Sequence, residues 1–202
     1  MLYALNDDAP EKDKDEKDAK DKFSGLDERM LKARTILIFG GIDQKLAQGV
    51  TARLLAMSYE NDDPITIFLN SQGGHVESGD TIYDTIKFVK PKVRIVGTGW
   101  VASAGALIFS AADRENRLCL PNTRFLLHQP SGGAGGKASD VAIQAKEIIR
   151  MRKRLNEIFA RETGQPLERI EKDTDRDYWM TADEAVAYGL VGRIVQSQGD
   201  LA

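Results

Sequence analysis

The amino-acid sequence predicts an α/β fold, because apolar runs typical of strands alternate with helical patterns. The first strand pattern is at 34–39, and apolar residues spaced by four then indicate a helix at 46–54. A second strand pattern at 65–69 precedes a helical pattern at 82–89, and a third strand is predicted at 92–97. Repeated strand–helix units of this kind are typical of α/β proteins.

The regular alternation ends after the third strand. Two strands are predicted close together at 117–120 and 124–128, and a glycine-rich segment follows at 132–136. A long amphipathic helix is predicted from about Ser139 to Thr163, with Gly164 at its C-cap. This helix is longer than a small sheet can cover.

The two ends of the chain differ in composition. Residues 1–22 are dominated by interleaved Asp, Glu and Lys, so we expect a charged, disordered tail followed by one domain at 23–202. Near the other end, Thr181 and Glu184 have the spacing of a capping box, which predicts a short helix before a last strand at 190–195.

Composition places the chain among ordinary water-soluble proteins. Of its 202 residues, 42% are hydrophobic and 29% are charged, and the formal net charge is −3. The chain has no excess of basic residues of the kind that favours binding to nucleic acid or to an anionic membrane. No apolar run reaches the roughly 18 to 20 residues of a membrane span. The single cysteine, Cys119, excludes an internal disulfide and suits a reducing compartment, so we expect a cytoplasmic protein with a buried, inert thiol.

Ser103 is the candidate nucleophile. It lies among small residues just after an apolar strand and at the start of an apolar helix, where the helix N-terminus favours negative charge. The alternative is that these small residues only let two helices pack closely. A serine nucleophile needs a base, and His128 ends the predicted strand 124–128, although a histidine there can also be a surface residue. Several carboxylates from Glu171 to Asp177 could orient that base, and their pattern does not choose among them.

Two adjacent glycines after a strand would suit an oxyanion hole. Gly73 and Gly74 follow a strand, and their backbone N–H groups could approach a substrate together with the N–H of Ala104. The alternative is an ordinary tight turn. The segment 132–137 lacks the first glycine and the Ser or Thr of a phosphate-binding loop, and His75 with its neighbours forms no metal-ligand cluster. We therefore expect no cofactor and no metal.

Several short motifs, in this order, resemble those of the proteolytic subunits of Clp proteases, which are serine peptidases. The similarity extends from about residue 35 to 195. The motifs are Asn70–Gly74, Ala102–Gly105, Cys119–Asn122, His128–Pro130, Thr163–Pro166, Glu171–Asp177 and Ala185–Leu190.

This resemblance implies the ClpP/crotonase-like α/β fold and assigns roles to individual residues. It implies Ser103 as nucleophile, His128 as general base and Asp177 as the acid that orients it. It also implies the backbone N–H groups of Gly74 and Ala104 as oxyanion donors. The expected reaction is hydrolysis of peptide bonds through a covalent acyl-enzyme.

The same resemblance implies how substrates and subunits are bound. We expect Gly73, His75, Pro130 and Ser131 to contact the substrate, which would be an unfolded protein or a short peptide. The glycine-rich strand and the long helix would form a protruding handle by which two seven-membered rings stack, and Arg176 would link this pairing to the catalytic residues.

A ring-shaped ATPase is the partner that the resemblance implies. Its docking pocket in the family is rich in large apolar side chains, and Phe68, Phe88, Leu118 and Leu120 fit this description. Two alternatives to an active peptidase are a non-catalytic subunit of a mixed ring and a crotonase-like enzyme acting on acyl-CoA.

Overall fold

The structure, a computed structural model, describes residues 25–133 and 135–201, and it is built on one seven-stranded sheet. The tail predicted at 1–22 lies outside the described residues. Five strands follow the order β1-β2-β3-β4-β7, while β5 pairs with β3 and β6 pairs with β5. The strands are β1 (Thr35–Ile42), β2 (Ile65–Gly74), β3 (Val93–Ala102), β4 (Arg117–Cys119), β5 (Arg124–Leu127), β6 (Tyr178–Met180) and β7 (Arg193–Ile194).

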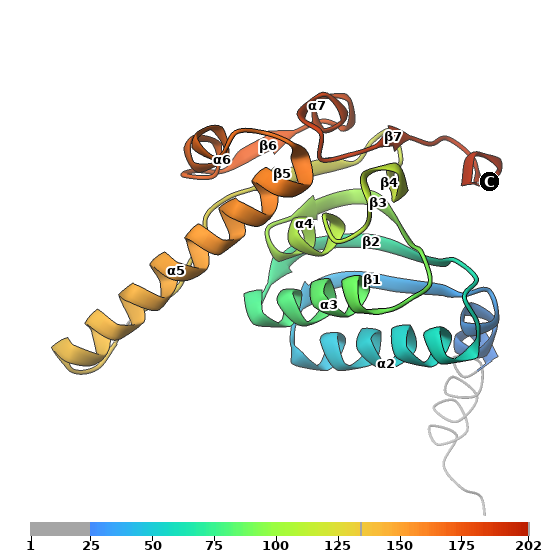
Figure 1. Ribbon diagram of the computed structural model, residues 1–202, viewed down its shortest axis with the longest axis horizontal. Helices are drawn as coiled ribbons and strands as arrows, with labels where there is room; N and C mark the ends of the chain where they lie inside the picture. The colour runs from blue at the N-terminus through green and yellow to red at the C-terminus, as the bar shows by residue number, and fades with distance from the viewer. Residues whose placement is uncertain (1–24, 134, 202) are drawn as a thin grey trace, which may run out of the picture.

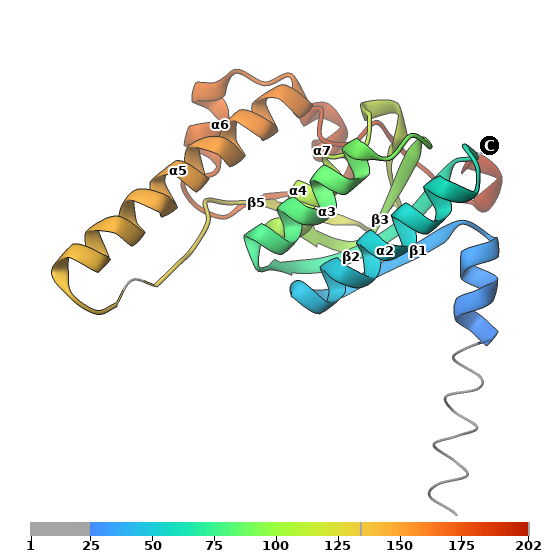
Figure 2. The same ribbon diagram turned by 60° about the horizontal axis from the view of Figure 1, so that its bottom comes forward.

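The helices lie mainly on one side of this sheet, and one of them projects away from it (Figures 1 and 2). They are α2 (Gln44–Glu60), α3 (Val76–Phe88), α4 (Ala104–Phe109), α5 (Ala138–Thr163), α6 (Leu167–Asp173) and α7 (Ala182–Tyr188), and residues 25–32 are also helical. Short 3₁₀ turns occur at Arg114–Asn116 and Gln198–Leu201. Within the described residues no helix has the length and apolarity needed to cross a membrane.

The pairing of the strands confirms the predicted α/β fold. Neighbouring strands run parallel from β1 to β7 and between β3 and β5, whereas β5 and β6 are antiparallel. The core lies between the sheet and α2, α3 and α4, where side chains such as Ile38, Leu54, Ile67 and Ile82 are completely buried. Each such side chain stabilises the fold by about 1.5 to 3 kcal/mol relative to exposure.

Polar residues begin the helices and glycines end them at several predicted positions. The side chain of Asp43 accepts a hydrogen bond from the first turn of α2. Thr181 and Glu184 form the predicted capping box of α7. Gly164 and Gly189 adopt left-handed conformations after α5 and α7, which confirms the predicted ends of both helices.

The third strand is longer than its sequence pattern predicts. It continues past the predicted end at 97 as far as Ala102, so that it stops immediately before Ser103. Gly99 interrupts the apolar pattern because the strand bulges there: its φ is +63°, and a Cβ atom would lie 2.8 Å from the side-chain amide of Asn70. A bulge of this kind redirects the end of a strand, and here it lies next to the candidate nucleophile.

Three further differences concern the second half of the chain. Neither α6 nor β6 was predicted, and the last strand is limited to Arg193–Ile194. The glycine-rich segment forms no strand in its described residues, 129–133 and 135–137, because no strand of this chain lies beside it. The helical part of the expected handle is present, since α5 projects from the rest of the molecule.

Candidate active site

Ser103 occupies a sharp turn between β3 and α4. Its φ of 56° and ψ of −122° lie in a region that non-glycine residues rarely adopt. The turn is held on both sides, because the N–H of Ser103 donates to the carbonyl of Leu126 at 3.0 Å and its carbonyl accepts from the N–H of Leu107 at 3.1 Å. This is the strand-to-helix placement that the sequence predicts for Ser103.

Gly73 approaches this turn as closely as glycine allows, whereas Gly74 packs against β1. A Cβ atom on Gly73 would lie 2.6 Å from the Cβ of Ser103 and 2.9 Å from the carbonyl oxygen of Ala102. The φ angles of the two glycines are +97° and +152°, and a Cβ on Gly74 would clash with the backbone of Ile42. The strand end is thus packed backbone against backbone next to the hydroxyl of Ser103.

The pairing of β3 with β5 brings His128 to the same edge of the sheet as Ser103. The two strands are parallel, and Ala102 lies opposite Leu126. Ser103 directly follows β3, and His128 directly follows β5, so that both lie at carboxyl ends of neighbouring strands.

The pairing of β5 with β6 places Asp177 opposite His128. These strands are antiparallel with Leu127 opposite Tyr178, and the next position of that register joins His128 to Asp177. The Nδ1 atom of His128 lies 3.4 Å from the Oδ1 atom of Asp177. The side chain of His128 is 25% exposed and that of Asp177 is 65% exposed.

A small cavity touches both Ser103 and His128. Its volume is about 10 Å³, and the rest of its lining is mostly apolar: Val76, Ala104, Leu107, Pro130, Leu155 and Phe159. Within the described residues, the Nε2 atom of His128 is buried and makes no hydrogen bond. Ser103 and His128 thus line one cavity, and Asp177 lies beside the imidazole; a hydroxyl, an imidazole and a carboxylate are the groups needed for acyl transfer by a nucleophilic serine.

An open groove of about 460 Å³ leads away from this cavity, between the end of β2 and α5. Gly74, His75, Pro130 and Ser131, four of the residues singled out in the sequence, line the groove together. Gly73 is not part of its lining, because it packs against Ser103 instead. The His75 ring is held at both nitrogens: Nδ1 shares a hydrogen bond of 2.9 Å with the Ser78 hydroxyl, and Nε2 lies 3.2 Å from the Glu77 carboxylate.

The segment before Asp177 is attached to both His128 and α5. Next to His128, the backbone N–H of Gln129 donates to the carbonyl of Thr174 at 2.6 Å, and its side chain donates to the carbonyl of Asp175 at 2.7 Å. From α5, the side-chain oxygen of Asn156 accepts from the hydroxyl of Thr174 at 2.9 Å, and Arg152 donates to Asp175 at 3.0 Å.

Sequence analysis missed this attachment, although one signal was present. Asn156 is a polar residue on the apolar face of the long helix, and it is almost completely buried there. A buried amide of this kind needs a hydrogen-bonding partner. Arg176 is exposed and lines a depression together with His128 and Asp177, so the structure places it beside the residues with which the sequence associated it.

The comparisons with known proteins show which family the chain belongs to. Residues 17–198 match the Clp protease family. The chain belongs to the Clp protease family. It is therefore a serine-type peptidase, and the family resemblance seen in its motifs is confirmed.

Similar proteins of this family extend over most of the chain. The ATP-dependent Clp protease proteolytic subunit 3 of Rhizobium etli is 64% identical over 172 residues, which cover 85% of this chain and 89% of the relative. The proteolytic subunit 2 of Gluconobacter oxydans is 57% identical over 96% of this chain and 89% of the relative. The solved structure of ClpP1 from Listeria monocytogenes has a TM-score of 0.80 and 52% identity, covering 88% of this chain and 99% of that one.

This Clp protease chain has a second depression, far from Ser103 along the strands. It has a volume of about 610 Å³ and is lined by side chains that include Met30, Thr66, Phe68, Leu120 and Val195. Two residues expected there lie elsewhere. Leu118 is buried beneath the depression in a small apolar cluster, and Phe88 is exposed at the end of α3.

Cys119 is completely buried, as predicted, and burial followed by the charge of Asp183 raises the pKa of its thiol to about 12. In residues 25–133 and 135–201, no group of three or more His, Cys, Asp or Glu side chains converges to hold a metal ion.

The chain's two tryptophans stack beside the strands that carry the site. The rings of Trp100 and Trp179 are 6.4 Å apart between centroids, with their planes 5° from parallel. Arg124 lies over the Trp179 ring at 4.4 Å. Trp100 is on β3 and Trp179 is on β6, so the stack joins the strand before Ser103 to the strand after Asp177.

Proposed function

We propose that this chain hydrolyses peptide bonds with Ser103 as nucleophile, His128 as general base and Asp177 as the orienting acid. The observation that carries the proposal is the strand register. It brings the ends of β3, β5 and the start of β6 together and leaves Nδ1 of His128 3.4 Å from Asp177. The family membership supports the same chemistry.

In this mechanism the proton moves between named atoms. His128, with its Nδ1–H directed to Asp177, accepts the Ser103 hydroxyl proton at Nε2 while Oγ attacks the substrate carbonyl. The proton then passes to the leaving amine, and the acyl-enzyme remains. Water attacks this ester with the same base, which releases the acid product and regenerates the hydroxyl. Among the described residues the Nε2 atom of His128 makes no hydrogen bond, which leaves it free to accept this proton.

The oxyanion of each tetrahedral intermediate would be bound by the N–H groups of Gly74 and Ala104. Ala104 is the first residue of α4, and the N–H groups of a first helical turn have no partner within the helix. The close packing of Gly73 against Ser103 supports a fixed position for this part of the site. Each such donor contributes about 10²- to 10³-fold to the rate.

The substrate would be an extended peptide, from an unfolded protein or a short fragment. The groove lined by Gly74, His75, Pro130 and Ser131 is open, and Gly73 precedes it and packs against Ser103. The apolar lining of the cavity beside Ser103 favours an apolar side chain before the cleaved bond.

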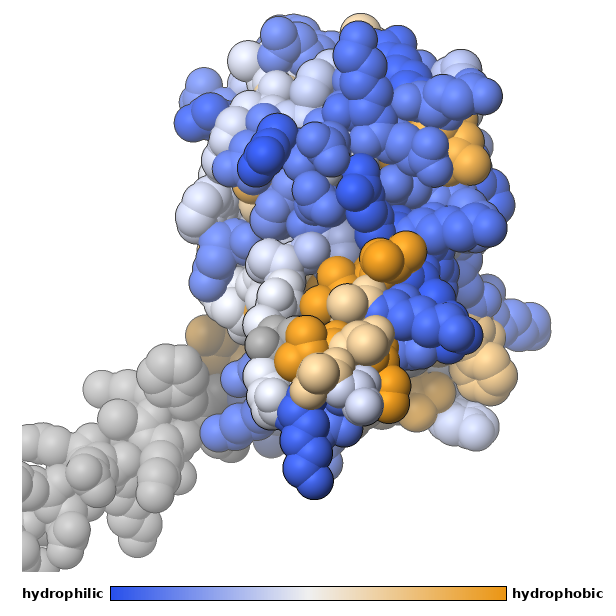
Figure 3. Space-filling view, turned by 90° about the vertical axis from the view of Figure 1, so that its left-hand side faces the viewer, coloured by the Kyte–Doolittle hydropathy of each residue, from blue (hydrophilic) through white to orange (hydrophobic). Residues whose placement is uncertain are grey.

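Assembly into two stacked heptameric rings is the quaternary structure that we propose. The projecting end of α5 carries the exposed apolar side chains Val141, Ile143 and Ile149, and Figure 3 shows orange side chains gathered on this end. Burial of these side chains between subunits would account for their exposure in the single chain. Arg176, beside Asp177, would link the pairing of the two rings through the handle to the alignment of the catalytic residues.

A ring-shaped ATPase is the partner that we propose for the depression around Phe68 and Leu120, where an apolar segment would fit. The relatives are named ATP-dependent proteases, which supports an ATP-consuming partner. The peptidase itself would need no nucleotide, and a cytoplasmic location follows from its reduced, buried thiol and its family.

Labelling with a fluorophosphonate tests the chemistry directly. We expect strong labelling of Ser103 in the assembled particle, none in Ser103→Ala and little in His128→Ala. The matched control is Ser110→Ala, since the hydroxyl of this buried serine, directly after α4, donates only to the carbonyl of Leu107. An unlabelled Ser103 in a particle of ring mass would contradict the proposal and favour a non-catalytic ring subunit. Native mass measurement on the same sample tests the rings, and monomers under all conditions would contradict them.

A further inference from the structure

The cavity beside Ser103 is walled by three helices that meet there. Val76 comes from α3, Leu107 from α4, and Leu155 and Phe159 from α5. With about 10 Å³, the cavity has room for about one water molecule, and a peptide side chain enters only if these helices separate. Whatever joins α3 to α5 therefore limits the size of the side chain that can enter.

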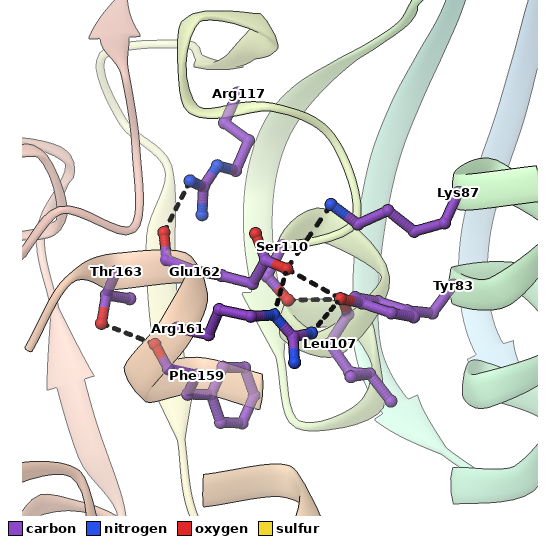
Figure 4. Close-up of polar contacts among 9 residues, drawn as sticks. All are labelled: Tyr83, Lys87, Leu107, Ser110, Arg117, Phe159, Arg161, Glu162 and Thr163. Carbon is purple, nitrogen blue, oxygen red and sulfur yellow. Dashed lines mark hydrogen bonds and ion pairs between the residues drawn. The ribbon is translucent and has the colours of Figure 1, made fainter. Parts of the chain in front are cut away.

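A hydrogen bond joins α3 to α5 two turns beyond the cavity. Tyr83 follows Val76 by seven residues, and Glu162 follows Leu155 by seven, so each pair lies on one face of its helix. The hydroxyl of Tyr83 donates to Oε1 of Glu162 at 2.8 Å, as Figure 4 shows. The two helices thus meet in apolar contact at the cavity and in a polar contact further along.

Two cations hold the Glu162 carboxylate in place. Arg161 donates from Nε to Oε1 of Glu162 at 3.2 Å and from Nη2 to the hydroxyl of Tyr83 at 2.8 Å. The Lys87 ammonium, from α3, lies 3.4 Å from the same carboxylate oxygen. The Glu162 side chain is only 12% exposed, and its Oε1 atom receives all three of these groups; separating a buried carboxylate from its partners is costly.

The tyrosine remains a hydrogen-bond donor at every physiological pH. Burial, and then the hydrogen bond to Glu162, raise the pKa of Tyr83 to about 12. Its hydroxyl therefore keeps the proton that it shares with Glu162. We name the side chains of Tyr83, Lys87, Arg161 and Glu162 the α3–α5 clamp.

The end of α5 that carries the clamp is itself fixed to the sheet. Arg117 of β4 is almost completely buried, and its Nη2 atom donates to the backbone carbonyl of Glu162 at 2.7 Å. Figure 4 shows Arg117 on one side of Glu162 and Tyr83 on the other. Because this end of α5 is fixed, the clamp restrains α3 relative to the sheet as well as to α5.

A second polar contact joins α3 to α5 nearer the cavity than the clamp. Arg154 of α5 donates to both carboxylate oxygens of Asp80 on α3, at 2.7 and 2.6 Å. Asp80 lies between Val76 and Tyr83 in the sequence, and Arg154 precedes Leu155. A bidentate pair of this kind has a defined geometry, so the spacing of α3 and α5 is set at two levels.

We infer that the α3–α5 clamp is a positioning device that sets the width of the cavity and hence the largest side chain accepted before the cleaved bond. This inference rests on the proposed function, because the cavity receives that side chain only if Ser103 is the nucleophile. Tyr83 and Glu162 touch no reacting atom. They act through Val76, Leu155 and Phe159.

A series of short peptides that differ only in the residue before the cleaved bond tests this inference. The assembled enzyme is compared with Tyr83→Phe, Glu162→Ala and the double variant, on peptides with Ala, Leu or Phe at that position. Releasing the clamp widens the cavity, so we expect kcat/KM for the Phe peptide relative to the Ala peptide to rise by about tenfold. In an apolar pocket one methylene already changes such a ratio of kcat/KM values by about 10- to 200-fold. The change lies in KM for the Phe peptide, and kcat for the Ala peptide stays within about twofold.

The double variant and the conservative variant identify the clamp as one unit. If Tyr83 and Glu162 act through each other, the double variant shifts the ratio no further than either single change. Glu162→Gln keeps an acceptor for the Tyr83 hydroxyl, so it changes the Phe-to-Ala ratio less than Glu162→Ala does. Matched controls are Glu157→Ala, an exposed position on the same helix, and Tyr59→Phe, an exposed tyrosine on α2. Neither control changes the ratio.

Two results would overturn the inference. One is an unchanged Phe-to-Ala ratio in Tyr83→Phe, the smallest of these changes, with a thermal transition showing that it is folded. The other is an equal loss of kcat/KM on all three peptides, which indicates a merely structural role. Failure of the proposed function is recognised separately, because a small fluorophosphonate reacts without entering the cavity. An unlabelled wild-type Ser103 refutes the triad. Normal labelling with an unchanged Phe-to-Ala ratio refutes only the role of the clamp.

Discussion

Ser103 and Asp177, the two ends of the proposed triad, are held in different ways. Ser103 is fixed by backbone: its N–H and carbonyl are both hydrogen-bonded, and Gly73 packs directly against it. Asp177 is largely exposed, and it reaches His128 at 3.4 Å from a strand of three residues.

The supports of the two residues also come from different parts of the chain. Ser103 depends on β2, β3 and β5 in the core of the sheet. The segment before Asp177 depends on Thr174 and Asp175, which are held by Asn156 and Arg152 of α5. The nucleophile is therefore placed by the folding of the core, whereas the acid is placed by the long helix that projects from it. Displacing α5 would disturb the acid before the nucleophile.

Asp177→Asn gives the largest effect and tests whether the exposed side chain is the orienting acid. We expect kcat to fall by about 10⁴-fold, because an amide no longer holds the imidazole in the required tautomer. A fluorogenic peptide assay measures this. Asp175→Asn is the matched control, since it removes only the side-chain contact with Arg152. If kcat fell as far in this control as in Asp177→Asn, the assignment of Asp177 as the orienting acid would be wrong.

Gly73→Ala tests the rigid side of the comparison. Its Cβ would overlap Ser103 and Ala102 at a positive φ, so we expect kcat to fall by about 10²-fold through displacement of the hydroxyl, together with a loss of about 2 to 4 kcal/mol of stability. The measurements are peptide hydrolysis and thermal unfolding. Gly133→Ala serves as control, because nothing lies within 4 Å of a Cβ there. Full activity in Gly73→Ala would show that the close packing does not position Ser103.

Thr174→Val tests whether α5 holds the acid. The substitution leaves the side-chain oxygen of Asn156 without its donor, so we expect a loss of about 1 to 3 kcal/mol and a decrease in kcat of about tenfold from the misplaced acid. Thr123→Val removes an equally buried hydroxyl that donates to Gly97. Both variants should unfold at lower temperature, but only Thr174→Val should lose kcat. Equal kcat values in the two variants would show that α5 does not hold the acid in place.

Thr181→Ala gives the smallest effect. It removes the N-cap of α7 immediately after β6, and we expect about 1 kcal/mol of lost stability with kcat unchanged. Backbone and side-chain hydrogen bonds from Thr181 hold the pKa of Glu184 below its usual value. Because this pKa is lowered by folding, the contribution of Glu184 is present at neutral pH and is lost as the pH falls through the carboxyl range. Thermal unfolding at pH 7 and at pH 3.5 should therefore show a smaller difference between wild type and variant at the lower pH.

The sequence predicts Ser103 and His128 as candidates because each follows a strand with a clear apolar pattern, and the structure has both residues directly after strands. Sequence reasoning could not choose the acid from the pattern, since β6 is only three residues long and its register with β5 decides which carboxylate faces His128. The resemblance to the Clp family was needed for Asp177. The α3–α5 clamp left no signal, because Tyr83 and Glu162 are 79 residues apart and neither interrupts a helical pattern.

The stack of Trp100 on Trp179 gives the molecule an optical signal at its site. These are the only tryptophans in the sequence, and one lies three residues before Ser103 while the other lies two residues after Asp177. Parallel indole rings with centroids 6.4 Å apart are close enough for their electronic transitions to couple. Intrinsic fluorescence and near-ultraviolet circular dichroism therefore report, without any added dye, on the moment when the strand of the acid separates from the strand of the nucleophile.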